Sequence, residues 1–153
     1  MALFLLSSIP VCQSVLPTYL MATAWLANAL LHAVGEVSQI AETSIWSLKY
    51  SVTVADKCSG LELAWFLGAT LLAFPATWGK RLLGAALGFV FLSVLNVLRV
   101  ASLYLIGVHG TGAFAVIHED AWPALMILAT VVGASAWIAW ALPKERLEGH
   151  AAA

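Results

Sequence analysis

Residues 82–107 read LLGAALGFVFLSVLNVLRVASLYLIG and contain a single charged side chain, that of Arg99. About 20 apolar residues are enough for a helix to cross the hydrocarbon core of a membrane. This stretch exceeds that length, so it predicts one long membrane-spanning helix. Within it, Gly84 and Gly88 have the small-xxx-small spacing that allows close packing against a neighbouring helix.

The whole chain shares this apolar character. Of its 153 residues, 62% are hydrophobic and 10% are charged, whereas a soluble domain has about 25% charged residues. Seven tryptophans fit anchoring at a membrane interface. We therefore expect an integral membrane protein with a single domain over residues 1–153, surrounded by membrane lipid. The formal net charge of −1 argues against nucleic acid as a partner.

Other apolar runs predict further helices, over about residues 3–16, 18–34, 60–76 and 121–142. We place a break at Pro17, because one helix over all of residues 3–34 would be about 48 Å long, more than a simple span needs. The helix over 18–34 is expected either to cross the membrane or to lie along its surface. The predicted fold is an all-α membrane bundle of about four to five transmembrane helices.

Residues 36–58 interrupt the apolar pattern with several charged side chains. From Trp46 to Val54, apolar and polar residues alternate, which is typical of a half-buried strand. Residues 37–40 are expected to pair with this strand, giving a short β-hairpin over about 37–54. This segment is the only extramembrane structure of any size that the sequence predicts.

The positive charges predict the orientation. We expect residues 78–81 to form a short polar turn and residues 108–120 to form a loop. Lysine and arginine are absent from that loop but occur in the turn and in the C-terminal tail, as Lys80, Arg81, Lys144 and Arg146. The positive-inside rule places the turn and the tail in the cytoplasm. Segment 36–58 and loop 108–120 then lie on the extracytoplasmic face of the cytoplasmic (inner) membrane.

Three reactive side chains are expected at that face. Cys58 stands at the start of the helix predicted over 60–76, where the helix N-terminus favours a thiolate. Arg99 follows Arg81 by 18 residues, about 27 Å along a helix, which is close to the full hydrocarbon thickness. His118 stands at the outer end of the last helix. Each also has an ordinary explanation: a small buried cysteine, an arginine extending to lipid headgroups, and a loop histidine.

Four polar residues lie near these three in sequence. Asn96 is expected to orient Arg99 from the same helix face, and Glu62 to pair with Arg99 or with a lysine. Glu119 and Asp120 are expected to fix the tautomer of His118. Ordinary capping or interfacial polarity is the alternative explanation for all four.

The sequence predicts no metal and no cofactor. His118, Glu119 and Asp120 lack the spacing of a His-Glu-x-x-His helix, and Cys12 and Cys58 are far apart in the sequence. Neither a P-loop nor a Rossmann glycine pattern occurs in the chain.

Several motifs together resemble the exosortase and archaeosortase family. These motifs are Cys58-Ser59-Gly60-Leu61, Asn96-Val97-Leu98-Arg99-Val100-Ala101-Ser102-Leu103, and His118 before the last span. Phe74-Pro75 followed by Lys80-Arg81-Leu82-Leu83-Gly84 is similar to the family's cytoplasmic turn. The resemblance covers roughly residues 36–142, and the short chain looks like a compact, exosortase H-like subgroup.

The resemblance implies a membrane-embedded, sortase-like cysteine transpeptidase. Its catalytic residues would be Cys58, Arg99 and His118, and its substrates secreted proteins that end in a short motif, a transmembrane helix and a basic cluster. The acceptor nucleophile is unknown. The chief competing hypothesis is a non-catalytic small transporter or assembly subunit that uses Arg99 as an intramembrane charge. An intramembrane metalloenzyme is a further alternative.

Overall fold

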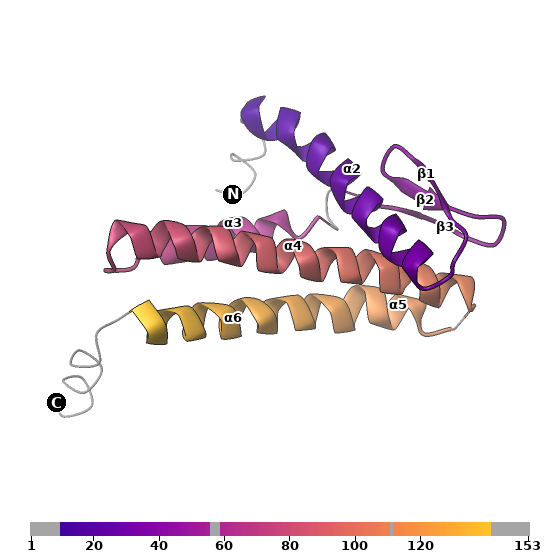
Figure 1. Cartoon of the computed structure of the whole chain (residues 1–153). Helices are drawn as coiled ribbons and strands as arrows, with labels where there is room; N and C mark the ends of the chain where they lie inside the picture. The colour runs from indigo at the N-terminus through magenta and orange to yellow at the C-terminus, as the bar shows by residue number, and fades with distance from the viewer. Residues whose placement is uncertain (1–9, 56–58, 111, 142–153) are drawn as a thin grey trace.

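The computed structural model describes residues 10–55, 59–110 and 112–141, with side chains from residue 16 onward. The described chain is mostly helical, with one small sheet (Figure 1). In chain order its elements are α2 (Pro10–Ala33), β1 (Gln39–Ala41), β2 (Ser44–Trp46), β3 (Ser51–Thr53), α3 (Leu61–Ala73), α4 (Trp78–Val108), α5 (Phe114–Val116), the π-helical turn η2 (Ile117–Ala121) and α6 (Trp122–Ala141).

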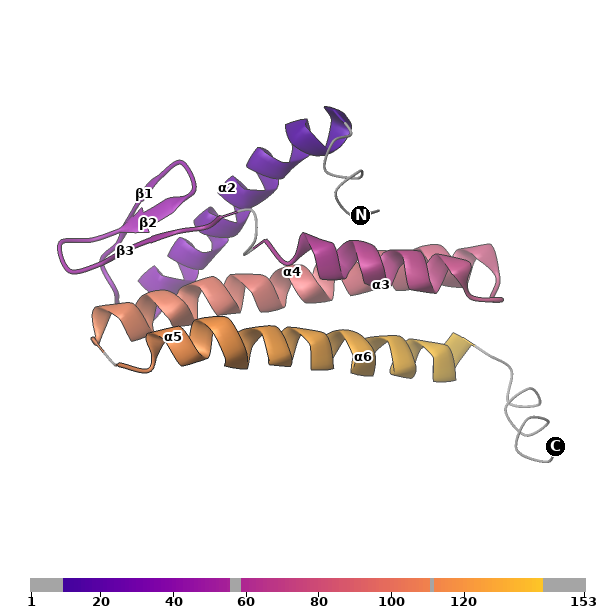
Figure 2. The same ribbon diagram turned by 180° about the vertical axis from the view of Figure 1, so that it is seen from behind.

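Helix α4 is the element around which the others are arranged. Helices α3 and α6 lie along it, and α2 crosses it obliquely (Figures 1 and 2). The sheet lies beside the C-terminal half of α4, next to the end of α2. The long apolar helix predicted over 82–107 is confirmed as α4. The sheet and the other long helices pack against it.

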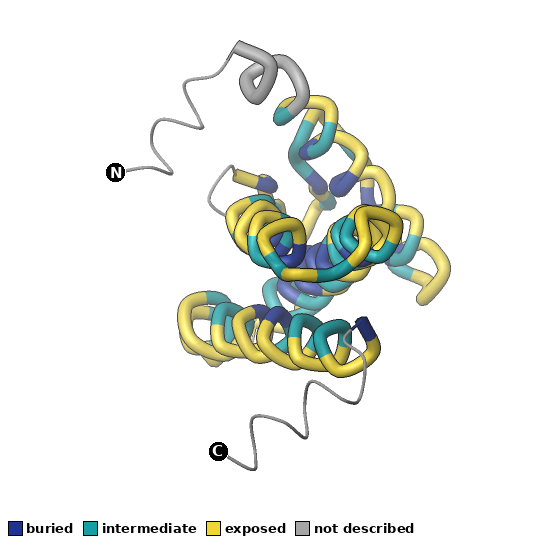
Figure 3. Tube along the Cα trace, turned by 90° about the vertical axis from the view of Figure 1, so that its left-hand side faces the viewer, coloured by how far each residue is buried: buried dark blue, intermediate teal, exposed yellow. Residues whose placement is uncertain are grey.

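The core has two parts. Residues of α2, among them Ala24 and Leu31, pack against Tyr104 of α4 and Ile45 of β2. The second part joins α3, α4 and α6 through Leu67, Leu71, Leu92 and Met126. Figure 3 shows the buried segments in dark blue where these elements face one another. Because lipid is as apolar as these side chains, close packing rather than exclusion from water holds such helices together.

The small-residue spacing in α4 serves this packing, as predicted. A Cβ atom at Gly84 would overlap the indole of Trp137 from α6. A Cβ atom at Gly88 would lie 2.7 Å from Cδ2 of Leu67 in α3. Each glycine therefore accommodates a large side chain of a neighbouring helix rather than a neighbouring backbone.

The predicted hairpin region is a three-stranded antiparallel sheet in the order β1-β2-β3. Gln39 pairs with Trp46 in the first ladder, and Trp46 pairs with Ser51 in the second. The single strand predicted from Trp46 to Val54 is wrong, because the chain reverses between Ser47 and Tyr50. The Ser47 N–H donates to the Tyr50 carbonyl at 2.8 Å, and Leu48 at the tip is fully exposed, so the apolar alternation there does not reflect burial.

The predicted helix break at Pro17 is also wrong. Helix α2 continues through Pro17, and residues 3–9 of the first predicted helix lie outside the described residues. Proline removes one backbone hydrogen bond. In apolar surroundings a full break would leave several more backbone groups unpaired, so the continuous helix is the less costly arrangement.

The predicted polar turn at residues 78–81 is the first turn of α4 instead. The chain reverses just before it, where Phe74 and Thr77 have extended backbone (ψ 146° and 147°). Arg81 then donates from Nε to the carbonyl of Ala76 at 2.7 Å and from Nη1 to that of Leu72 at 3.1 Å. These carbonyls lie at and just beyond the end of α3, where a cation complements the helix dipole.

The last helix starts earlier than predicted. Residues 114–121 form α5 and η2, so His118, Glu119 and Asp120 are helical rather than part of a loop. Gly110, with φ +64°, marks the true connection after α4. The helices predicted over 60–76 and 121–142 correspond to α3 and α6, and residue 142 lies outside the described residues.

Two described helices are long and apolar enough to cross a membrane, Trp78–Val108 and Phe114–Ala141. Helix α3 has 13 residues, about 20 Å at 1.5 Å per residue, which is shorter than the hydrocarbon core of about 30 Å. The predicted mostly helical fold with a small sheet is confirmed, whereas four to five transmembrane helices are not.

Candidate functional site

A cavity of about 200 Å³ lies between the sheet, α4 and the start of the last helix. Its walls come from three separate parts of the chain, namely Tyr50, Ser51, Val52, Thr53 and Val54 of the β3 region, Arg99, Val100 and Leu103 of α4, and Phe114 and His118 of α5 and η2. Two of the three predicted catalytic residues, Arg99 and His118, thus meet in one cavity although they are distant in sequence.

Arg99 is buried, with 8% of its surface exposed. Its Nε atom is buried without a hydrogen-bond partner among the described residues. An unpaired donor on a buried cation is costly, so a protein rarely keeps one for stability alone. Arg99 is therefore a largely buried cation at the wall of the cavity.

His118 lies in η2 and lines the same cavity, and its side chain is half-buried. Its imidazole stacks on the ring of Phe114 with centroids 5.7 Å apart and an interplanar angle of 6°. This contact fixes the plane of the imidazole. π-helical turns inside α-helices occur frequently at functional sites, and this one places His118 at the wall of the cavity.

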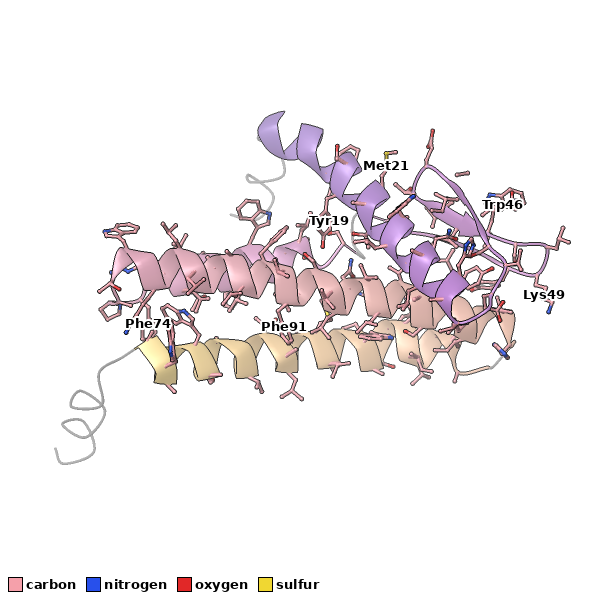
Figure 4. All side chains as sticks on the ribbon, viewed as in Figure 1. Tyr19, Met21, Trp46, Lys49, Phe74 and Phe91 are labelled. Carbon is pink, nitrogen blue, oxygen red and sulfur yellow. The ribbon has the colours of Figure 1, made fainter. Side chains whose placement is uncertain are left out.

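Asn96 lies one helical turn before Arg99 and is completely buried. Its Nδ2 donates to the backbone carbonyl of Ser59 at 2.8 Å, so the predicted contact with Arg99 is replaced by one with the Cys-Ser-Gly motif. The hydroxyl of Tyr19 donates to the same carbonyl at 3.2 Å, and Figure 4 shows Tyr19 on the side of α2 that faces α3 and α4. Two donors from different helices thereby hold Ser59 in place.

Gly60 lets the chain turn directly after this anchored residue. Its φ of +68° is a conformation that side chains with a Cβ rarely adopt. Ser59 Oγ accepts the N–H of Leu61 at 3.3 Å, at the start of α3. The expected helix start after the Cys-Ser-Gly motif is therefore confirmed. Cys58 itself lies outside the described residues.

The predicted acidic partners are all exposed. Glu62 is exposed on α3, and its expected ion pair with Arg99 does not occur in the described part of the chain. Glu119 and Asp120 are exposed as well. The expected role of these two carboxylates in fixing the tautomer of His118 stays a prediction. Exposure of all three agrees with the alternative explanation, ordinary interfacial polarity.

Three aromatic residues of the site were not predicted. Besides Tyr19, these are Tyr50 and Phe114, whose rings meet edge to face with centroids 6.1 Å apart. Tyr50 fits because Gly107 of α4 has no side chain, since a Cβ atom there would overlap the phenol ring. In the sequence, the signal for the packing of Tyr50 on α4 was Gly107, a glycine among large side chains.

Ser59 is bonded to Asn96 of α4, and Arg99, one helical turn further along α4, lines a cavity together with His118. Residues 1–133 match the family model described as transmembrane exosortase. The chain belongs to the transmembrane exosortase family. The exosortase resemblance seen in the sequence is therefore confirmed, and the apolar helices agree with a membrane protein. Searches among curated proteins and among solved structures each found no match to this exosortase.

Proposed function

We propose that this exosortase is a membrane-embedded cysteine protease and transpeptidase. It cleaves the C-terminal sorting signals of secreted proteins through a thioester acyl-enzyme. The observation that carries the proposal is that Arg99 and His118 line one cavity. Ser59, which directly follows Cys58, is held beside the same helix by Asn96.

In the proposed reaction the thiolate of Cys58 attacks the scissile carbonyl carbon, and a C–S bond forms. The carbonyl oxygen becomes an oxyanion, which the Arg99 guanidinium stabilises in a cavity with little water. As the C–N bond breaks, His118 gives a proton to the leaving amine. Water or an acceptor amine then attacks the thioester, and its proton passes to His118 while the thiolate leaves.

The features around Arg99 support its role. A preorganised cation acts most strongly where the surroundings have a low dielectric constant, and Arg99 is 8% exposed. The Nε donor of Arg99 has no hydrogen-bond partner among the described residues, so the charge of this cation is incompletely compensated there. His118, held against Phe114, provides the neighbouring proton donor and acceptor.

We further propose how the protein lies in the membrane. The sheet lies near the C-terminal end of α4 (Figure 1), and Arg99 and Leu103 of that half of the helix line the cavity. Lys80 and Arg81 lie in the first turn of α4, at its other end. With the basic end in the cytoplasm, the cavity opens at the extracytoplasmic face of the inner membrane. Helices α2 and α3 expose apolar side chains such as Trp25 and Phe66, which fits a bundle of four to five helices surrounded by lipid.

The test is co-expression with a secreted protein that carries a C-terminal motif, a transmembrane helix and a basic cluster. Cys58→Ala should abolish processing of this substrate and the accumulation of a hydroxylamine-sensitive acyl-enzyme. Cys12→Ala is the matched control, since it removes the chain's other cysteine, and it should process normally. Wild-type processing by Cys58→Ala contradicts the nucleophile assignment. Normal function of Cys58→Ser together with loss in Arg99→Gln would point to a transporter instead.

A further inference from the structure

Strand β3 is at the outside of the sheet. The strand order is β1-β2-β3, so β2 covers one edge of β3, and no strand in the described ranges pairs with the other. We call this other side, over Ser51–Thr53, the outer edge of β3. An unpaired edge presents backbone donors and acceptors that can pair with another extended chain.

The hydrogen-bond pattern identifies which groups face outward. The Val54 N–H donates to the Thr43 carbonyl at 2.9 Å, and the Ser47 N–H donates to the Tyr50 carbonyl at 2.8 Å. In an antiparallel pair, hydrogen-bonded and non-hydrogen-bonded positions alternate. Tyr50, Val52 and Val54 therefore direct their backbone groups toward β2. Ser51 and Thr53 direct theirs toward the outer edge.

The outer edge also faces the cavity. Five consecutive residues, Tyr50 to Val54, line it. A strand that presented one of its faces would contribute only every second residue, because successive side chains point to opposite faces. Consecutive contacts arise when the strand presents its backbone edge. The other walls of this cavity carry Arg99 and His118.

An extended polypeptide is the occupant that matches these features. Lipid tails and transmembrane helices have no free backbone donors to pair with Ser51 and Thr53, whereas an extended peptide supplies a complementary row. We propose that the outer edge of β3 binds the substrate segment around the scissile bond as an added strand, with alternate side chains toward the cavity. This proposal rests on the proposed peptidase function and names how that site holds its substrate.

The test compares two variants at one position. Thr53→Pro removes the outward N–H, and an edge strand tolerates proline where the N–H does not serve the ladder. Thr53→Ala keeps that N–H, and both variants lose the Thr53 hydroxyl contact with Ser44. With purified full-length protein in nanodiscs and a tripartite-signal substrate, Thr53→Pro should raise KM about three- to tenfold above Thr53→Ala, as loss of one backbone hydrogen bond predicts. Equal KM values overturn the proposal.

A second measurement leaves the enzyme unchanged. Single N-methyl groups are placed on successive backbone amides of the same substrate near its cleavage site. Strand addition requires that the rise in KM alternate from one residue to the next, because only every second amide faces β3. A rise in KM that is the same at every amide, or no rise at all, overturns the strand-addition proposal, while cleavage of the substrate still supports the proposed peptidase function.

If the wild type does not cleave the substrate, or Cys58→Ala cleaves it equally well, the proposed peptidase function fails instead. A concentration-dependent dimer that Thr53→Pro abolishes without raising KM assigns the edge to a second copy and overturns the proposal.

Discussion

Asn96 donates a 2.8 Å hydrogen bond from its side-chain amide to the backbone carbonyl of Ser59. This contact connects the Asn-x-x-Arg motif of α4 with the Cys-Ser-Gly motif that precedes α3. Asn96 and Arg99 are three residues apart, so they share one helix face. Asn96 holds the chain beside Cys58, the proposed nucleophile, and Arg99 lines the cavity. The three-residue spacing therefore suits the proposed chemistry.

Asn96→Asp should therefore impair catalysis. The substitution keeps the size of the side chain but replaces the amide donor by a carboxylate, which repels the Ser59 carbonyl. Tyr19 still donates to this carbonyl, so the loss is that of one hydrogen bond, about 0.5–1.5 kcal/mol, and we expect kcat to fall about two- to tenfold. The measurement is the rate of substrate cleavage by purified enzyme.

Asn28→Asp is the matched control for this change. Asn28 accepts a hydrogen bond at Oδ1 from the hydroxyl of Ser38 at 2.7 Å, and aspartate retains that acceptor. The control should keep nearly full activity. Equal activity of Asn96→Asp and Asn28→Asp would show that the contact with Ser59 does not position the nucleophile.

Arg99→Met should separate activity from stability. Removal of one donor that stabilises an oxyanion costs about 10²–10³ in kcat. The variant also removes a buried charge whose Nε has no partner among the described residues, and apolar replacement of such charges is often neutral or stabilising. Cleavage assays and thermal unfolding in detergent test both expectations. A large loss of stability in Arg99→Met would assign Arg99 a structural role.

The sequence predicted those features that depend on local pattern. The long apolar run around Arg99 is α4, and the polar segment 36–58 contains the sheet. The helix and the polar segment can both be predicted from the hydrophobicity of neighbouring residues, because neither depends on a contact with a distant part of the chain. Gly84 likewise signalled close packing, since a glycine in an apolar helix leaves space that Trp137 fills.

Features that depend on distant contacts were not predictable. The bond from Asn96 to Ser59 joins positions 37 residues apart, and the bond from Tyr19 spans 40. No periodicity identifies such pairs. Glu62 is exposed and makes no ion pair with Arg99 or a lysine among the described residues, because charge complementarity in a sequence does not determine which helix face is buried. The helix break predicted at Pro17 was wrong for a similar reason. The surroundings of a proline, and not the residue alone, decide whether a helix continues through it.

Gly107→Ala should displace the sheet from the cavity. The new methyl group would overlap the ring of Tyr50, and overpacking of this kind costs about 1–3 kcal/mol. Because Tyr50 also forms a wall of the cavity, KM should rise along with the loss of stability. Gly133→Ala in α6 is the control, since its Cβ would have no neighbour within 4 Å. Thermal unfolding and cleavage kinetics distinguish the two, and equal stability of both variants would contradict the packing argument.

Phe114→Leu should lower kcat through the orientation of His118. The variant keeps an apolar side chain but loses the stacked ring (centroids 5.7 Å apart). Aromatic pairs contribute about 0.5–1.5 kcal/mol beyond area burial, so kcat should fall about two- to tenfold. Phe114→Tyr retains the ring and should recover most of the rate. Phe91→Leu, at an exposed phenylalanine of α4 (Figure 4), should leave kcat unchanged, and a similar loss there would point to a general packing effect.

Arg81→Gln should show the opposite behaviour to Arg99→Met. Arg81 lies in the first turn of α4, whereas Arg99 and Leu103 in the C-terminal half of that helix line the cavity. Arg81 donates to the carbonyls of Ala76 and Leu72 near the end of α3. Its loss should destabilise the protein by about 1 kcal/mol, since hydrogen bonds at a partly exposed site have modest net value. The cleavage rate of the folded fraction should remain that of the wild type. Arg81→Lys keeps the charge but not the two-point geometry of the guanidinium, so it should recover only part of the stability in thermal unfolding. A fall in kcat with unchanged unfolding would mean that this end of the bundle takes part in the reaction.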